Sequence, residues 1–409
     1  MNKAVFPVGL HQLHPDVSMN FQMNRWFSWV GEPGMLDEMR NAAPRIANYL
    51  DWKREFLLLA DHASAQGHAL RAGFYFRAAD FFMLADDPDR RNARKQFLEA
   101  MRSVYALDPL ARHAVLYAAK GSSGVLPAYR FTPIRSKGTI VFFGGFDSYI
   151  EELTTAFFYL RDAGYEVIAF EGPGQGGALN DAGLHMTPDW HLPVKAVLDH
   201  FKLDHVTLVG LSMGGCLVMR AAAFEPRVAR VVAYDIYPDA LDTTLRQVNS
   251  VQRGLLKALL KLRVAPVVNA MARRAARKSP IAQWGLEEGM HVTGASSPYG
   301  YFKRTSAYVT ADVSALITQD VLLLAGSEDH LVPMAHFHRQ IELLTNARSL
   351  TARLFTAGES AGSHCQVGNY GLAFRTIVNW LDQLQGYAQG NEVASSVAAP
   401  KRESEMSAT

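Results

Sequence analysis

The sequence is short of cysteine and has no long apolar run. Its only cysteines, Cys216 and Cys365, cannot build a disulfide framework, so a reducing compartment is favoured over secretion. We expect both to be buried. No window approaches the roughly 20 apolar residues that a membrane-spanning helix needs. Residues 1–12 lack a sustained apolar core, so we predict no signal peptide and a cytoplasmic protein without stable membrane insertion.

The sequence also lacks an excess of either charge. It has 41 basic and 39 acidic residues, and the net charge of +2 gives no global reason to expect nucleic acid as a partner. Apolar residues make up 49% of the chain and charged residues 20%, which is typical of a globular protein with a large core. We expect a small-molecule substrate as the partner, and the chain is compatible with a homodimer.

Residues 1–122 carry a helical pattern and no catalytic signature. Apolar residues recur at three- and four-residue spacing over 35–58 and 60–85. The turn at 86–89 begins a further helix over 91–105. This segment is too long to be a linker and too apolar to be disordered. We therefore predict a helical domain beside the catalytic one, which covers its cleft or forms a dimer contact.

Strand-like and helical segments alternate over residues 123–388. The apolar runs with strand character are 125–131, 139–143, 166–170, 205–209, 228–234, 320–324 and 350–355. Strands joined by helices form parallel sheets that are covered on both faces, so we predict a mostly parallel eight-stranded sheet. Residues 389–409 are rich in Ala, Ser, Glu and Lys without periodicity, which predicts a disordered tail.

The most informative motif is Gly210-Leu-Ser-Met-Gly214, between the strand run at 205–209 and a helix-like segment. A Gly-x-Ser-x-Gly on a strand-to-helix turn is the nucleophile elbow of α/β-hydrolases. Glycines are needed because the turn is sharp and the helix packs close to the strand. The motif therefore predicts Ser212 as a nucleophile, and an ordinary glycine-rich turn is the alternative.

A serine nucleophile needs an acid and a histidine, which follow it in that order in α/β-hydrolases. Asp329 ends an apolar strand and fits the pattern Gly-x-x-Asp-x-x-x-Pro, so we predict it as the acid. The neighbouring Glu328 is an alternative. Asp235 or Asp239, after the strand at 228–234, is another, since some hydrolases place their acid there.

His364 is the predicted base. It lies in the Gly/Ser-rich loop at 358–369, which follows the last strand, whereas most other histidines precede the elbow or lie on helices. His330 stands beside the predicted acid, and His336 and His338 stand on the helix after it, so all three are poorly placed. We therefore predict that His364 takes the proton of the serine hydroxyl.

An oxyanion hole is predicted where the strand at 139–143 ends in Gly144-Gly-Phe146. Small residues let backbone N–H groups approach a developing negative charge, and we predict the N–H groups of Met213 and Phe146 as donors. Each such donor typically contributes about 10²–10³ in rate.

The segment at 241–315 is a long helical insertion, which we predict to be a lid over the active site. Within it, 251–276 is amphipathic and basic, so a membrane-surface helix is the alternative. The glycine-rich run at 171–177 lacks the Gly-Lys-Ser/Thr of a P-loop and the spacing of a dinucleotide fingerprint, so a tight turn is favoured over phosphate binding. We predict no cofactor and no metal.

Taken together, these motifs resemble one branch of α/β-hydrolases, which includes 2,6-dihydroxypseudooxynicotine hydrolase and fungal hydrolases that shorten aromatic polyketides. The matching segments cover most of the chain and are 75–79, 144–152, 171–176, 188–190, 210–215, 284–290 and 362–369. Pro188-Asp-Trp190 and His364-Cys-Gln366 are more specific than the elbow. The resemblance implies a helical domain beside a hydrolase core, and members of the branch are often dimers. It also implies that the predicted triad and the predicted oxyanion donors have the roles given above. The segment from Ser212 to Asp329 is longer than in the branch, so substrate contacts in the lid are not carried over.

The resemblance also implies hydrolysis of a carbon–carbon bond next to a ketone in an aromatic or polyketide-like substrate. Asp147, Tyr149 and Glu171 are candidates to hold substrate hydroxyls, and a structural role is the alternative for each. The same triad would serve hydrolysis of an ester, thioester or lactone, or acyl transfer. A binding protein on a hydrolase scaffold is disfavoured because all positions of the triad are filled.

Overall fold

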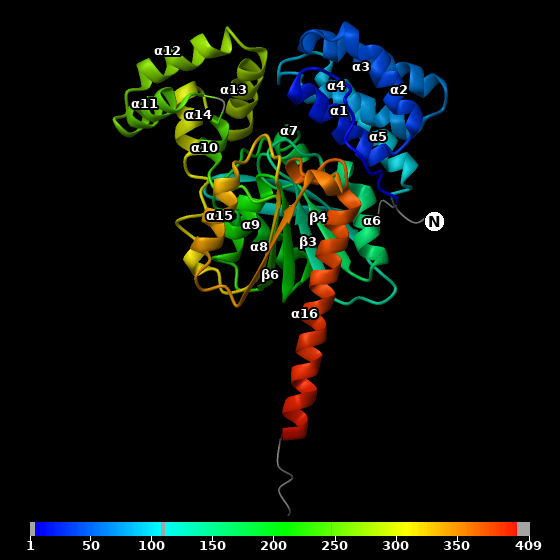
Figure 1. Cartoon of the computed structure of the whole chain (residues 1–409), viewed down its shortest axis with the longest axis vertical. Helices are drawn as coiled ribbons and strands as arrows, with labels where there is room; N and C mark the ends of the chain where they lie inside the picture. Colours follow the sequence, from blue (N-terminus) through cyan, green and yellow to red (C-terminus); the bar gives the residue numbers. More distant parts are fainter. Residues whose placement is uncertain (1–4, 108–110, 247, 399–409) are drawn as a thin grey trace, which may run out of the picture.

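The computed structural model describes residues 5–107, 111–246 and 248–398. A sheet flanked by helices forms the body of the molecule, and two groups of helices lie side by side at one end of it (Figure 1). The last helix, α16 (Tyr370–Ala398), extends from the body in the opposite direction (Figure 1). Along the described residues, we find no helix with the length and apolar character needed to cross a bilayer. The cytoplasmic location and the homodimer stay predictions.

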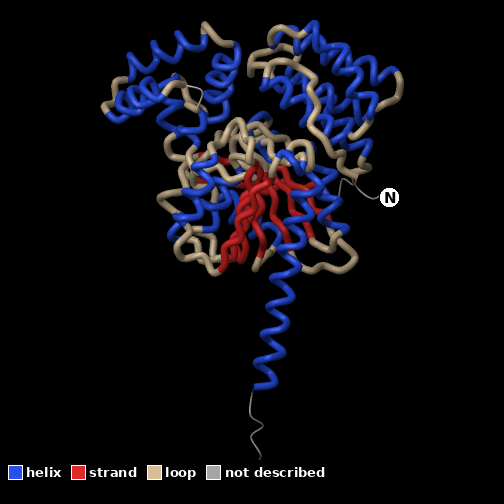
Figure 2. Tube along the Cα trace, viewed as in Figure 1, coloured by secondary structure: helices blue, strands red, loops and turns tan. Residues whose placement is uncertain are grey.

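The strands gather into one sheet inside the body of the molecule (Figure 2). This sheet has eight strands in the order β1-β2-β4-β3-β5-β6-β7-β8. The strands from β4 to β8 along this order pair in parallel, while β1 and β2 are antiparallel to their neighbours. Their bounds are β1 Arg112–Ala119, β2 Ser122–Phe131, β3 Thr139–Phe143, β4 Glu166–Phe170, β5 Val206–Leu211, β6 Val228–Tyr234, β7 Asp320–Gly326 and β8 Ser349–Phe355. The predicted fold class, a mostly parallel eight-stranded sheet with helices around it, is confirmed.

Strand side chains alternate between two cores, one on each face of the sheet. Ile140 and Phe142 of β3 pack beneath α6 and α16, whereas Val141 and Phe143 pack beneath α8 and α9. The helices of the core are α6 Thr154–Asp162, α7 Gly176–Asn180, α8 His191–Phe201, α9 Gly214–Ala222, α15 Met334–Leu343 and α16. Because both faces are covered, the central strands are apolar throughout, which is why their pattern was visible in the sequence.

The N-terminal segment is helical as predicted, but its helices end before residue 122. They are α1 Val17–Val30, α2 Pro33–Ala42, α3 Tyr49–Ala65, α4 Ala69–Phe81 and α5 Arg90–Val104. The Asp16 carboxylate caps α1 by accepting the Met19 N–H, and Gly31, with φ of 72°, ends it. Strand β1 lies inside the range predicted to be helical, so we propose a domain boundary between α5 and Arg112.

The predicted lid segment folds into a second group of helices at the same end of the sheet as the N-terminal helices (Figure 1). They are α10 Ala240–Thr244, α11 Ser250–Lys261, α12 Ala265–Ala276, α13 Pro280–Thr293 and α14 Pro298–Thr305. The two helical groups contact each other, since the Trp284 indole N–H donates to the Phe81 carbonyl at 3.1 Å. We propose that these helices close the site from two sides as a lid.

The predicted disordered tail at 389–409 is wrong in its first part. Helix α16 continues through this range to Ala398, and residues 399–409 lie outside the described residues. The segment contains Ala, Glu, Gln and Val but no proline before Pro400. Alanine and glutamate favour a helix, and a proline stops one at about the preceding residue.

Candidate active site

The elbow is a strained turn between β5 and α9. The Ser212 φ of 59° is a conformation that residues other than glycine rarely adopt. Close backbone contacts leave no space for a side chain at two neighbouring glycines. A Cβ on Gly210 would lie 2.1 Å from the Gly214 carbonyl oxygen, and a Cβ on Gly215 would lie 2.0 Å from the Asp235 carbonyl oxygen. The strained backbone conformation is therefore at Ser212, the residue that the motif predicts as the nucleophile.

We expect the Gly215→Ala variant to lose much of its stability, because its new methyl group would meet a backbone oxygen that cannot move aside. Overpacking costs about 1–3 kcal/mol and sometimes more. Gly254→Ala on α11 is the matched control, since no atom lies within 4 Å of that Cβ position. Alanine there should preserve or raise stability by up to about 1 kcal/mol. Thermal unfolding measures both, and a Gly215→Ala protein that melts at the wild-type temperature would contradict this account.

Three predicted side chains meet at the ends of different strands. The Ser212 Oγ lies 2.8 Å from the His364 Nε2, and the His364 Nδ1 lies 2.6 Å from the Asp329 Oδ2. The second oxygen of that carboxylate, Oδ1, accepts the N–H groups of Leu331 at 2.6 Å and Val332 at 2.9 Å. A hydrogen-bonded path thus runs from a hydroxyl through an imidazole to a fixed carboxylate.

The charges of this path support one another. Burial opposes ionisation of Asp329, but the His364 charge and the hydrogen bonds it receives outweigh this and lower the pKa of that carboxyl. Burial likewise lowers the pKa of His364, but the Asp329 carboxylate outweighs it, so the pKa of His364 stands above its ordinary value. A carboxylate that remains ionised beside the imidazole favours transfer of a proton from the hydroxyl to Nε2.

The alternative acids lie less favourably. Glu328 is exposed, and Asp239 caps α10 by accepting the Asp242 N–H. Asp235 is buried with a carboxylate oxygen 3.9 Å from the His364 Nδ1, beyond hydrogen-bond range. Burial, followed by the charge of Asp329, raises the pKa of Asp235 well above its ordinary range, so this group tends to stay neutral.

Asp235, Asp329 and His364 are the one group of three possible metal ligands that lies close together in the described ranges. Ligand atoms of Asp235, Asp329 and His364 all lie within 4.8 Å of one another. A transition-metal ion needs about 2.0–2.2 Å to each nitrogen or oxygen ligand, which places neighbouring ligand atoms about 3 Å or more apart. The 2.6 Å separation of His364 from Asp329 is a hydrogen bond and leaves no room for an ion between them.

The predicted oxyanion loop, 144–148, packs against the elbow. A Cβ on Gly145 would lie 2.9 Å from the Ser212 Cβ and 3.2 Å from the Met213 nitrogen. Among the hydrogen bonds of the described residues, neither the Phe146 N–H nor the Met213 N–H has an acceptor. These two N–H groups, beside a strained serine and without an acceptor among the described residues, are available for a substrate oxygen.

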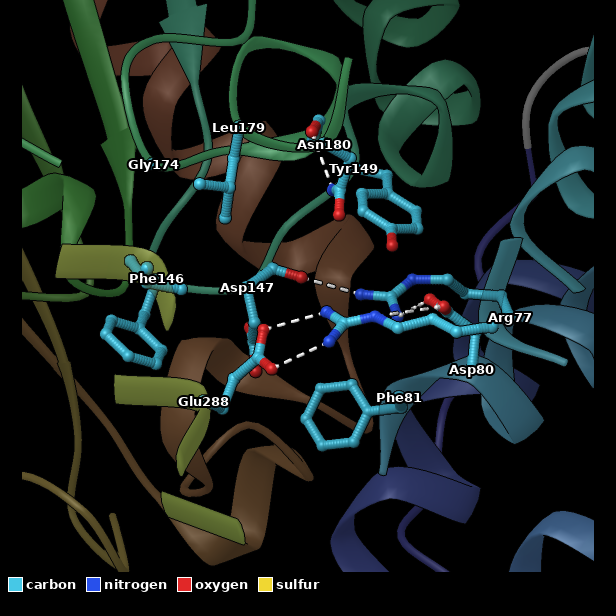
Figure 3. Close-up of a pocket in the computed structure, with 13 residues that line it drawn as sticks. Arg77, Asp80, Phe81, Phe146, Asp147, Tyr149, Gly174, Leu179, Asn180 and Glu288 are labelled. Atoms are coloured by element: carbon cyan, nitrogen blue, oxygen red, sulfur yellow. Dashed lines mark hydrogen bonds and ion pairs between the residues drawn. The ribbon is translucent and has the colours of Figure 1, made fainter. Parts of the chain in front are cut away.

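A cavity lies beside this loop, and helices α4, α5 and α13 contribute to its wall (Figure 3). Its wall is formed by Arg77, Asp80, Phe81, Arg90, Phe146, Asp147, Tyr149, Gly174, Gly176, Leu179, Asn180, Glu288 and Val292. Of the predicted substrate contacts, Asp147 and Tyr149 therefore line a cavity. Ser212 lies outside this wall, and Phe146 directly follows Gly145, which packs against the elbow.

Glu171 lies apart from the cavity. Its two oxygens accept the N–H groups of Ile150 at 3.0 Å and Gly177 at 2.6 Å. Burial, followed by the charge of Glu151, raises the pKa of Glu171 to about 8. Since both oxygens hold backbone loops together, these contacts favour the structural role for Glu171.

A buried ionic network, which the sequence did not indicate, joins the helical segments to the oxyanion loop. The Arg77 guanidinium donates to the Asp147 carbonyl at 2.6 Å and to Glu152 at 2.5 Å. Arg90 donates to both oxygens of Glu288 at 2.9 Å and so bridges α5 to α13. Charged residues on helices normally face solvent, so no local pattern could have revealed these contacts.

Side chains from both helical segments also lie near the triad. The centroid of the Phe21 ring, on α1, lies 4.6 Å from the centroid of the His330 ring and 6.3 Å from that of the His364 ring. From the inserted segment, Arg246 donates to the Asp329 carbonyl at 2.8 Å. Burial, with the charge of His364, lowers the pKa of His330 to about 4, so this second imidazole is neutral. Cys216 and Cys365 are both free and buried, as predicted.

Comparison with known proteins agrees with this architecture. A family model described as the alpha/beta hydrolase fold matches residues 142–361. Hydrolyase poxO of Penicillium oxalicum is 29% identical over 91% of this chain and 99% of its own length. Hydrolase acrC of Aspergillus aculeatus is 27% identical over 80% of this chain and 83% of its own.

Solved structures show the same fold. The crystal structure of 2,6-dihydroxy-pseudo-oxynicotine hydrolase is similar with a TM-score of 0.59 and 20% identity, covering 87% of this chain and 94% of that one. AbyA5 is similar with a TM-score of 0.63 and 17% identity, covering 90% and 97%. These matches confirm the predicted resemblance. With its sheet, its elbow and a family match over more than half its length, the chain belongs to the α/β-hydrolase fold family.

Proposed function

We propose that this protein is a serine hydrolase in which Ser212 is the nucleophile, His364 the general base and Asp329 the residue that orients it. The observation that carries the proposal is the unbroken path of hydrogen bonds, at 2.8 Å and 2.6 Å, through the two nitrogens of His364. The free N–H groups of Met213 and Phe146 complete the arrangement as the oxyanion hole.

The reaction would run through an acyl-enzyme. Ser212 Oγ bonds to the substrate carbonyl carbon while its proton passes to the His364 Nε2, and the carbonyl oxygen becomes an oxyanion. Collapse of this tetrahedral intermediate breaks the bond to the leaving group, which takes the proton from His364. Water, deprotonated by the same imidazole, then releases the acyl group as a carboxylic acid and frees Ser212.

We further propose that the bond cleaved is a carbon–carbon bond next to a ketone on an aromatic or polyketide-like substrate. The resemblance to the branch of 2,6-dihydroxypseudooxynicotine hydrolase supports this choice. A carbanion leaving group needs its charge spread as an enolate or phenolate. The cavity beside Phe146 has a volume of about 20 Å³, enough for about one water molecule, so its wall must move apart to admit such a molecule. The rings of Phe81 and Phe146 would then pack on an aromatic ring, and Asp147 would accept its hydroxyl groups.

A product analysis tests the bond that is cleaved. We expect acyl-phenols and β-diketones, incubated with the enzyme, to yield a carboxylic acid and a shortened ketone or arene by mass spectrometry. An acid and an alcohol or thiol from esters or thioesters, or a hydroxy acid from lactones, with no cleavage of the ketones, would assign the same triad to the alternative reaction. Simple aryl esters do not discriminate, because a shared acyl-enzyme lets both kinds of enzyme hydrolyse them.

A further inference from the structure

The glycine-rich loop at 171–177 lies between β4 and α7, and its Gln175 side chain is only 1% exposed. We propose that Gln175 is a positioning residue, which holds the peptide unit carrying the Phe146 N–H in the orientation that an oxyanion hole requires. This inference rests on the proposed serine mechanism, and it gives the loop a role that neither phosphate binding nor a simple turn provides.

The Gln175 side chain makes three hydrogen bonds, which use both of its N–H donors and one lone pair of its oxygen. Its Nε2 donates to the carbonyl oxygens of Gly144 at 2.6 Å and Gly145 at 2.9 Å. Its Oε1 accepts the Gly172 N–H at 3.0 Å. Because two partners are acceptors and one is a donor, the nitrogen and oxygen of the amide can be placed only in this way.

The bond to Gly145 acts directly on the proposed oxyanion donor. The carbonyl of Gly145 and the N–H of Phe146 belong to one planar trans peptide unit, so they point in opposite directions. Fixing the carbonyl on Gln175 therefore fixes the N–H on the other side of the unit. A hydrogen bond to the carbonyl also polarises the peptide and strengthens its N–H as a donor.

The neighbouring groups of the loop are held in the same way. The Gly145 N–H donates to the Ser148 Oγ at 3.0 Å, and Arg77 holds the Asp147 carbonyl at 2.6 Å. The Gly145 N–H and the carbonyls of Gly145 and Asp147 thus have partners within the protein, whereas the Phe146 N–H has no acceptor among the residues that the structure describes.

The glycines explain how a glutamine reaches this position. A Cβ on Gly172 would lie 2.4 Å from the Trp190 ring, and one on Gly174 would lie 2.4 Å from the Met186 Cβ. A Cβ on Gly176 would lie 1.8 Å from a carboxylate oxygen of Glu171. Only a glycine-rich chain packs this closely beneath the oxyanion loop, and the glutamine is the residue within it that supplies two donors.

The test is a pair of Gln175 variants assayed on 4-nitrophenyl acetate. Gln175→Met keeps the volume and removes every hydrogen bond, while Gln175→Glu keeps the shape and the acceptor for Gly172 but lacks the NH₂ donors. We expect kcat to fall about 10- to 100-fold in each, since displacement of a catalytic group by about 1 Å can cost about 10² and a lost oxyanion donor about 10²–10³. KM should change by less than about threefold, because the interaction belongs to the transition state.

Two further measurements separate positioning from stability. Rates are expressed per active site titrated with a fluorophosphonate, so that unfolded molecules do not lower the measured kcat. Binding of an aryl trifluoromethyl ketone, which forms a tetrahedral adduct with serine, should weaken by the same factor as kcat/KM. Gln340→Met is the matched control, since Gln340 is also fully buried and hydrogen-bonded, to Thr310 and Ser314, but lies outside the oxyanion loop.

The outcomes are distinct. A loss of kcat per titrated site beyond about threefold in every Gln175 variant that folds, with weaker ketone binding and a near wild-type rate for Gln340→Met, supports the inference. Turnover within about threefold of wild type in a folded Gln175 variant overturns it. Ser212→Ala is measured in parallel: if that variant keeps wild-type turnover, the proposed function itself fails, whereas an inactive Ser212→Ala beside active Gln175 variants removes only the role of Gln175.

Discussion

Ser212→Ala is expected to lower kcat by about 10⁶-fold, the scale of loss on removing the nucleophile of a serine triad. The variant loses the atom that bonds to the substrate, while the imidazole and the oxyanion N–H groups remain in place. Residual catalysis of about 10³–10⁴ over the uncatalysed reaction should persist, because a water molecule can still attack a carbonyl held in the oxyanion hole. Steady-state rates on the best substrate of the product analysis measure both effects.

The control for this experiment is Ser306→Ala, at an exposed serine after α14 whose hydroxyl donates to the Lys303 carbonyl. Its rate and melting temperature should match the wild type within error. Near-normal turnover by Ser212→Ala, with the fold intact, would contradict a covalent serine mechanism and would direct attention to the other polar groups around the cavity.

The strands of the sheet could be predicted to the extent that they are buried on both faces. The observed bounds of β3, β4 and β6 are those predicted, since a continuous apolar run bounded by polar residues has one interpretation in such a fold. An edge position alone does not hide a strand, since β8 lies at the other edge of the sheet and was predicted, but the apolar signal was too weak for strand β1. It pairs only with β2, and most of its residues are exposed or half-buried, so its sequence of Ala, His and Tyr carries little apolar signal.

The candidate site could be predicted where short motifs constrain the backbone, and not where contacts span long distances in the chain. The residue pairs Ser212–His364 and His364–Asp329 were found because an elbow, a strand end and a glycine-rich loop each mark a turn at one edge of the sheet. Gln175 stood in a motif but had no visible partner. Contacts such as Arg90–Glu288 depend on how the helical groups meet, which no local pattern determines.

Asp329→Asn should be the second most damaging change, with a fall in kcat of about 10⁴-fold. An asparagine that keeps the hydrogen bonds from Leu331 and Val332 would turn its NH₂ group toward the His364 Nδ1. The imidazole would then carry its proton on Nε2, facing the serine, and could not accept another. The loss of the carboxylate would also remove the charge that raises the pKa of His364.

The controls for this change are the neighbouring acids. Glu328→Gln alters an exposed side chain and should stay within about twofold of wild type, since surface substitutions rarely matter. Burial raises the pKa of the Asp235 carboxyl and so opposes its ionisation, which means that Asp235→Asn should cause a far smaller loss than Asp329→Asn. A larger loss in Glu328→Gln would reassign the acid within the loop, and a larger loss in Asp235→Asn would move it to the end of β6. Either result would leave the serine and histidine in place, because their hydrogen bond does not depend on which carboxylate orients the ring.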